Sequence, residues 1–238
     1  MAVYVYSVVG AEHPRRLDGL RGVGEAPESV LRGVTAGPLC AVVGDAPDGL
    51  RPGRADIEAH HAVQVRLMAD GAVLPLRFGL VTGDDDAVRA VLKEHAVAWT
   101  ELLSTLAGSE EYHLNAAQDE EILLRRILAE SSTARHLSEN IRAGVAADGA
   151  PLRLGELVAR EVRARQEALA MGVIEALRPF ARGVDSTRPT GADFLSVSFL
   201  VPEDQEETFL TTELSVAHQL GDDLDFRLHG PLPPYSFV

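Results

Sequence analysis

The stretch Val3-Tyr4-Val5-Tyr6-Ser7-Val8-Val9 lies at the beginning of the chain and contains a single polar side chain, that of Ser7. Valine and tyrosine favour extended backbone because their branched or aromatic side chains pack well on a pleated surface. We therefore predict a strand over residues 3–9. The short apolar stretch 38–44, bounded by turn residues, predicts a buried strand, and residues 29–34 predict another.

Two helices are predicted beyond these strands. In residues 56–68 one helical face carries Ile57, His61, Val65 and Met68. Adjacent helical residues point about 100° apart, so we expect His61 to be partly buried and His60 to lie at the surface. The second helix, residues 84–107, begins at three aspartates, which favour a helix N-terminus, and stops before Gly108.

The alternation of strands and helices in this half indicates a sheet with helices packed on one face. Further strands are predicted over residues 73–80 and, more weakly, 111–116. Ferredoxin-like topology with an extra N-terminal strand is the nearest common form. We therefore predict an N-terminal ferredoxin-like α/β domain over residues 1–108.

A long antiparallel helical hairpin is predicted in the second half, over about residues 118–182. Its two amphipathic segments, 118–145 and 151–180, are separated by the turn signal Asp148-Gly149. The hairpin belongs to the C-terminal α+β domain that we predict over residues 109–238.

The rest of this C-terminal domain contains one more helix and two more strands. A polar linker over 183–192 precedes a strand over 195–201, whose alternation predicts one buried face. A helix over 203–220 and a strand over 224–228 follow. The predicted fold class is α+β with two domains.

Charge and composition exclude several classes of protein. The 238 residues carry 22 basic and 36 acidic side chains, a formal net charge of −14, so we expect no nucleic-acid partner. No apolar run approaches the roughly 20 residues that a membrane helix needs, and the basic head of a signal peptide is missing. We predict a cytoplasmic protein without a membrane span. The single cysteine, Cys40, lies in an apolar stretch and should be buried.

No motif of an enzyme or cofactor site stands out. The sequence has no P-loop, no GxSxG and no HExxH, and its glycine-rich stretch does not lie between a strand and a helix. The pair His60-His61 cannot readily bind one metal, because the two side chains diverge on a helix. We therefore expect no catalytic residue, no cofactor and no metal site.

Two segments depart from this ordinary pattern. In Val73-Leu74-Pro75-Leu76-Arg77-Phe78-Gly79, Pro75 lacks an N–H and belongs at a sheet edge or bulge, and Arg77 is the only charge. The C-terminal segment GPLPPYSFV, residues 230–238, is apolar and stiffened by three prolines. It either packs on its own domain or docks on another protein. The candidate partner-binding or structural residues are Arg77, Phe78, Pro233, Pro234, Tyr235 and Phe237.

These two segments carry a resemblance to the GvpF/GvpL family of gas vesicle proteins. Residues 73–79 match the VLPLRFG segment of that family, and residues 230–237 resemble its GPWPPYxF ending, with Leu232 in place of the usual tryptophan. The opening strand, an HxAV helix at residues 60–63 and a strand-helix unit at residues 194–209 also resemble the family, in the same order. Asn115 departs from it, since lysine is usual there.

The resemblance implies an accessory or minor gas vesicle protein with two α/β domains, located in the vesicle or the cytoplasm. Such a protein would bind the shell protein GvpA and other accessory gas vesicle proteins during nucleation and vesicle formation. One alternative is a structural minor component of the gas-facing shell surface. Another is a small-molecule-binding regulator or enzyme with a ferredoxin-like sheet. The resemblance does not separate the F and L subgroups.

Overall fold

The computed structural model describes residues 2–24, 30–46, 49, 53–221 and 223–238, and has a mixed α/β fold with two β-sheets. Its contacts divide the chain into two compact units. The first contains Met1–Tyr112, Leu200–Glu203 and Gly230–Val238, and the second contains His113–Phe199 and Asp204–His229. We expected the C-terminal segment in the second domain, whereas it groups with the first unit.

The sheet of the first unit is built around β1 (Val3–Gly10). Its order is β2-β3-β1-β4, where β2 is Arg32–Ala36, β3 is Leu39–Asp45 and β4 is Val73–Pro75. β1 pairs antiparallel with β3, with β4 and with the short β5 (Val81–Thr82). The strands predicted over 3–9 and 38–44 are confirmed to within a residue.

The strand predicted over residues 73–80 is interrupted. The chain pairs with β1 at residues 73–75 and again at 81–82. Between them Leu76 and Leu80 still form backbone hydrogen bonds with Tyr6 and Val5 at 3.0 and 2.9 Å, and residues 77–79 leave the ladder. β4 ends the sheet order, so Pro75 lies on an edge strand, where its missing N–H costs least. The strand predicted over 29–34 lies at residues 32–36, and residue 29 is outside the described residues.

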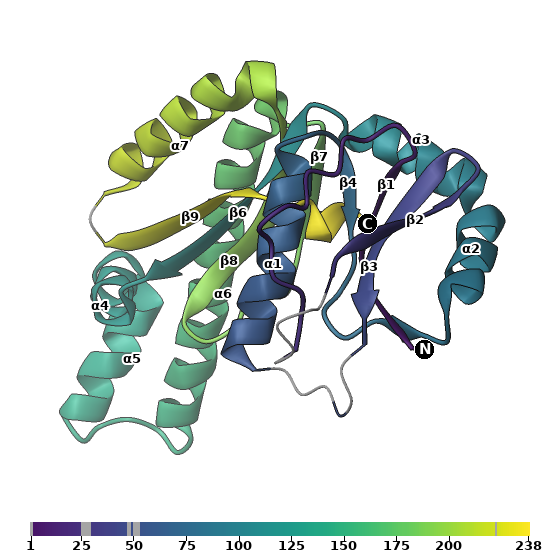
Figure 1. Ribbon diagram of the computed structural model, residues 1–238. Coiled ribbons are helices and arrows are strands. Elements are labelled where there is room, and N and C mark those ends of the chain that lie inside the picture. Colours follow the sequence, from purple (N-terminus) through teal and green to yellow (C-terminus); the bar gives the residue numbers. More distant parts are fainter. Residues whose placement is uncertain (1, 25–29, 47–48, 50–52, 222) are drawn as a thin grey trace. The chain divides into compact units, whose positions relative to one another are not determined.

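Helices cover both faces of this sheet, where we predicted only one. α1 (Arg54–Met68) packs on the face that contains Tyr4, Tyr6 and Val9. α2 (Asp85–Glu94) and α3 (Ala96–Leu106) pack on the face that contains Val3, Val5 and Val8, and Figure 1 shows them beside β1, β2 and β3. Both faces need cover because β1 carries large apolar or aromatic side chains on each of them.

The helix predicted over residues 84–107 is divided in two. The side chain of Asp84 accepts a hydrogen bond from the N–H of Ala87 at 2.9 Å and caps α2, as the acidic run predicted. His95 ends α2 and precedes α3. α2 contacts β2 and β3, and α3 contacts β1, β3 and β4, so the two short helices cover different parts of the sheet.

The face of α1 that contacts the sheet is not the predicted one. His60, Val63, Gln64 and Leu67 are buried, whereas Ile57 and Val65 are 47% and 40% exposed. His60 is therefore buried, and its predicted surface position is wrong. Apolar periodicity pointed to the other side of the helix because the buried face is half polar.

Polar groups of β1 explain this buried polar face. The Tyr4 hydroxyl donates to Nδ1 of His60 at 2.9 Å, and Nε2 of His60 donates to the Leu76 carbonyl at 2.9 Å. Gln64 accepts from the Ser7 hydroxyl and donates to the Tyr6 carbonyl. Each buried hydroxyl or carbonyl thus gains a partner that an apolar helix could not supply.

The second sheet has the order β7-β8-β6-β9, and most of its residues lie in the second unit, whereas residues 109–112, 200–202 and 230–232 group with the first. Its strands are β6 (Ser109–Gln118), β7 (Gly183–Ser186), β8 (Asp193–Pro202) and β9 (Leu224–Leu232). β7 occupies part of the predicted linker. β8 is buried from Leu195 to Pro202, so its predicted exposed face is wrong. On one side the Phe199 ring packs on Phe209 of α7 (Glu206–Leu220), with ring centroids 5.3 Å apart.

Both sheets contain the same connection. In the first sheet, the connection β3-α1-β4 places one strand on each side of β1. In the second sheet, the connection β8-α7-β9 places one strand on each side of β6. A ferredoxin-like order needs two such interleaved connections in one sheet. In the described residues of the first unit, β1, β2 and β3 follow one another without a helix. The described part of this unit therefore contains one such connection, where the predicted ferredoxin-like topology needs two.

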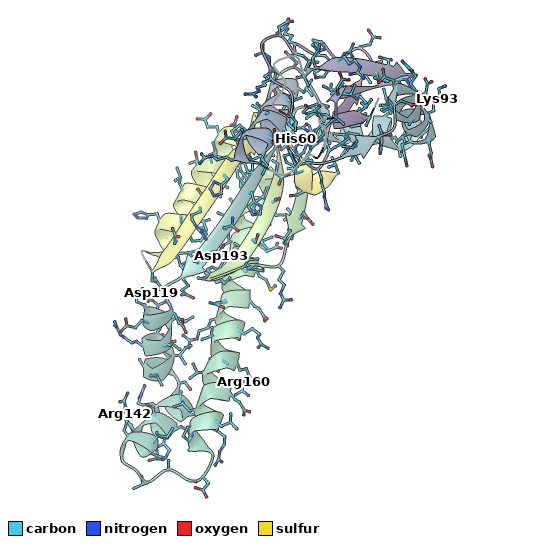
Figure 2. All side chains as sticks on the ribbon, turned by 60° about the horizontal axis from the view of Figure 1, so that its bottom comes forward. His60, Lys93, Asp119, Arg142, Arg160 and Asp193 are labelled. Atoms are coloured by element: carbon cyan, nitrogen blue, oxygen red, sulfur yellow. The ribbon has the colours of Figure 1, made fainter. Side chains whose placement is uncertain are left out.

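The predicted helical hairpin is present in the second unit. It consists of α4 (Glu120–Glu130), α5 (Ser132–Arg142) and α6 (Ala150–Leu177), and Figure 2 shows α4 and α5 alongside α6. Gly149 makes the turn with a φ of +77°, which glycine adopts easily. The first of the two segments breaks at Ser131, whose hydroxyl caps α5 by accepting from Ala134 at 3.2 Å.

The buried imidazole predicts loss of stability in acid. Burial lowers the pKa of His60 from its ordinary 6.5, so the unfolded chain binds a proton that the folded chain excludes. The free energy of unfolding should therefore be highest above pH 6.5 and fall as the pH drops below it. His60→Gln should flatten part of this slope, measured by urea denaturation at several pH values.

Burial also lowers the pKa of His13, so His13→Gln should remove a further part of the slope. At pH above 6.5, His60→Gln should cost about 1–3 kcal/mol, because the Tyr4 hydroxyl loses its acceptor. A pH profile identical to that of the wild type in both variants would contradict this account.

Candidate functional site: the C-terminal segment and the apolar groove

The C-terminal segment is packed into the first unit. Pro233 and Pro234 are buried, and a short 3₁₀ helix, Tyr235–Phe237, follows. The backbone N–H and the hydroxyl of Ser236 donate to the Glu111 carboxylate at 2.9 and 2.7 Å. Phe237 packs against the apolar cluster that β1 shares with α2 and α3. The segment therefore packs on the protein itself, against residues of the first unit, whereas we predicted packing on the C-terminal domain.

Gly230 lies directly against the ring of Tyr112. A Cβ at this position would stand 2.4 Å from Cδ1 and 2.9 Å from Cγ of that ring. The ring is 3% exposed and has little freedom to move aside. Glycine is thus required here by close approach of the backbone, which explains the first residue of the GPLPPYSFV segment.

The two segments singled out in the sequence meet at one pocket. A pocket of about 310 Å³ is lined by Leu76 and Arg77 from the first segment and by Tyr235 and Val238 from the second, with Val8 and Trp99 between them. A neighbouring pocket of about 350 Å³ shares Val8, Leu76 and Trp99 with it. We call the two pockets together the apolar groove.

The groove has a floor of sheet and two walls. Val5 and Val8 of β1 form part of the floor. One wall is the segment that links β4 to β5, including Leu80, and the other is formed by Val91 of α2 and Trp99 of α3. Leu80 and Val91 are 47% and 42% exposed, so apolar surface extends along both rims.

The predicted site residues divide between this groove and the core. Arg77 is exposed at the groove, and no ion pair joins it to another residue of the described chain. Phe78 points to the opposite face of the sheet, where its ring centroid lies 5.9 Å from Tyr4 and 5.7 Å from His60. Arg77 and Phe78 therefore do not share a site.

Tyr235 and Trp99 are the two aromatic residues of the groove, and each carries one polar group, a hydroxyl or an indole N–H. Burial, together with the Glu111 carboxylate, raises the pKa of Tyr235 to about 12. Its hydroxyl is protonated at neutral pH, as that of an unperturbed tyrosine is. The Trp99 ring stacks on His95 with centroids 4.6 Å apart. Trp99 lies within the helix predicted over residues 84–107, and its being the single tryptophan was the one signal in the sequence that could have singled it out.

Sequence reasoning also missed the buried network of His60 and Gln64. Their i, i+4 spacing on α1 is the signal that could have found it, because two polar residues one turn apart share a face.

The free thiol of Cys40 is buried, as predicted. Within the described ranges no three His, Cys, Asp or Glu side chains gather closely enough to hold a metal ion. No helix in those ranges has the length and apolar character to cross a membrane.

Fold and groove together define a mixed α/β protein with an apolar groove beside a packed C-terminal segment. The chain belongs to the family of the gas vesicle synthesis protein GvpL/GvpF, whose model matches residues 2–238. The resemblance seen in the two short segments thus extends along the whole chain.

Individual relatives agree with this assignment. The chain is 41% identical over 239 residues to gas vesicle protein F of Streptomyces sp. (strain CB03234), covering 100% of both proteins. It is 27% identical over 254 residues to gas vesicle protein L of the same organism, covering 99% of this chain and 92% of that protein. The crystal structure of GvpF from Anabaena sp. PCC7120 superimposes with a TM-score of 0.85 at 20% identity, covering 99% and 97% of the two chains.

The contact between Gly230 and Tyr112 yields a prediction about stability. Gly230→Ala should lower the free energy of unfolding by about 1–3 kcal/mol, because its Cβ overlaps the buried ring. Gly10→Ala is the matched control, since a Cβ there meets no atom within 4 Å. Urea denaturation of both variants measures the difference, and equal losses would disprove the close approach as the cause.

Proposed function

We propose that this protein is an accessory or minor component of gas vesicle formation that binds the shell protein GvpA and other accessory gas vesicle proteins during nucleation. The family match over residues 2–238 is the observation that carries the proposal. Relatives along the whole chain are named gas vesicle proteins, and we propose no catalytic activity. The greater identity to protein F than to protein L of one organism favours the F subgroup.

Physical chemistry supports a contact role before or during shell assembly. A shell subunit must present apolar surface to the gas, and such surface aggregates when it is exposed to water. A partner with a net charge of −14 stays dispersed, and its apolar groove offers that surface temporary cover. We propose that the two compact units act as two domains, with the C-terminal segment part of the first.

The second candidate function is that of a structural minor component of the gas-facing surface of the shell. Val145 and Leu152 flank the turn of the helical hairpin and are 71% and 69% exposed. Apolar side chains at the end of a hairpin favour contact with an apolar surface over contact with water. Washing isolated vesicles with urea distinguishes the two functions, because an assembly factor should be released and a built-in component should remain.

Co-expression with the shell protein tests the main proposal. A tagged copy of this chain should retain GvpA on an affinity column, and cells that lack the chain should not form vesicles. Absence of GvpA from the column at every salt concentration, together with normal vesicles in the deletion strain, would exclude the function.

Removal of residues 230–238 gives a further prediction. The deletion removes Phe237 from the apolar cluster and leaves the Glu111 carboxylate without Ser236, so the protein should lose solubility and vesicle formation together. Soluble expression and flotation of cells measure the two effects. Loss of vesicles with full solubility would instead assign the segment a docking role of its own.

A further inference from the structure

The apolar groove points to a specific kind of partner segment, an inference that rests on the proposed function. We propose that the groove binds an apolar stretch of a partner protein that carries an acidic side chain, and that the partner carboxylate pairs with Arg77. The juxtaposition of Arg77 with Tyr235, Trp99 and the exposed rims of the groove carries this proposal.

Charge complementarity selects the acidic group. Arg77 is the only charged side chain that lines either pocket of the groove, and no ion pair joins it to the carboxylate of Val238, which lines the same pocket. Some arginines of the described chain, such as Arg32 and Arg165, pair with carboxylates at 2.8 and 2.7 Å, and others, such as Arg160, form no ion pair there and lie outside the groove lining. Arg77 has no such pair within the described residues, although acidic side chains outnumber basic ones by 36 to 22. Its planar guanidinium can take an incoming carboxylate through two parallel hydrogen bonds.

The open rims favour a polypeptide over a small apolar acid. Sites for small molecules enclose about 70–90% of the ligand surface. Here Leu80, Val81 and Val91 are 47%, 44% and 42% exposed, so apolar surface continues beyond the floor of the groove. A peptide covers floor and rims together, whereas a fatty acid would leave the rims in water.

The residues at the groove are of the types that dominate protein interfaces. Arginine, tyrosine and tryptophan are enriched among residues whose truncation weakens protein complexes most. Arg77, Tyr235 and Trp99 line one pocket and come from three separated parts of the chain. The protonated Tyr235 hydroxyl can donate a hydrogen bond to the same partner segment.

Trp99 makes the proposal measurable, because it is the single tryptophan of the protein and lies in the groove. The probes are overlapping synthetic peptides that tile GvpA, with any tryptophan replaced by phenylalanine, and sodium decanoate as the small apolar acid. Each probe is titrated into the full chain while the fluorescence of Trp99 is recorded. At least one acidic apolar peptide should shift the emission to shorter wavelength, and decanoate should not.

Two pairs of variants test the site, each with a control that makes the same chemical change elsewhere. Arg77→Glu should weaken binding of that peptide about tenfold or more, because like charges replace an ion pair. Arg54→Glu changes another exposed arginine and should leave binding unchanged. Leu80→Asp should also weaken binding, whereas Val97→Asp, at a position 74% exposed and outside the groove lining, should not. Circular dichroism checks that all four variants are folded.

The outcomes separate this inference from the proposed function. Replacing the acidic residue of the binding peptide by its amide should weaken binding to the wild type but not to Arg77→Glu. The inference is overturned if no peptide shifts the emission, if decanoate alone binds, or if Arg77→Glu behaves like Arg54→Glu. Co-purification of intact GvpA that survives Arg77→Glu and Leu80→Asp would reject the groove and leave the proposed function standing. Failure of the wild-type chain to retain GvpA would reject that function itself.

Discussion

Burial of β1 on both faces and both edges is the constraint on which the first unit depends. The strand pairs with β3 on one edge and with β4 and β5 on the other, and every side chain from Val3 to Val9 is buried. A strand in this position leaves no polar atom to water, so each of its hydroxyls and carbonyls must find a partner inside the protein. The apolar clusters on its two faces and the polar contacts with α1 are both consequences of that requirement.

The hydrogen bonds of α1 with β1 fix the position of the segment that follows. His60 joins the Tyr4 hydroxyl to the carbonyl of Leu76, and the same hydroxyl accepts from the N–H of Gly79. These bonds hold the chain between β4 and β5 where it leaves the sheet. Phe78 turns inward against Tyr4 and His60, and Arg77 remains exposed on the groove. Buried polar contacts on one face of the sheet thus help to position the exposed Arg77 on the other.

The C-terminal segment has a structural role and also lines the groove. Its anchors are the close approach of Gly230 to Tyr112, the contact of Ser236 with Glu111, and Phe237 in the apolar cluster. Held in this way, Tyr235 and Val238 form one end of the groove. Packing of the segment on the protein therefore leaves Tyr235 and Val238 at the groove, where we propose that a partner segment binds.

Local sequence determined the features that depend on neighbouring residues. The run of Val and Tyr predicts β1 through strand propensity, and the aspartates at 84–86 predict the start of α2 through capping. Asp148-Gly149 predicts the hairpin turn through turn chemistry. Each of these effects acts over a few neighbouring residues. The two short motifs also sufficed to indicate the family, since their residue types and order are specific.

Only the tertiary structure decided which polar residues are buried and which distant segments meet. The packed face of α1 carries His60 and Gln64, and apolar periodicity cannot reveal a face that is buried because it satisfies polar groups of another strand. The meeting of Arg77 with Tyr235 depends on strand pairings and close packing between residues far apart in the chain. Such contacts follow from the arrangement of the whole unit, and no local pattern contains them.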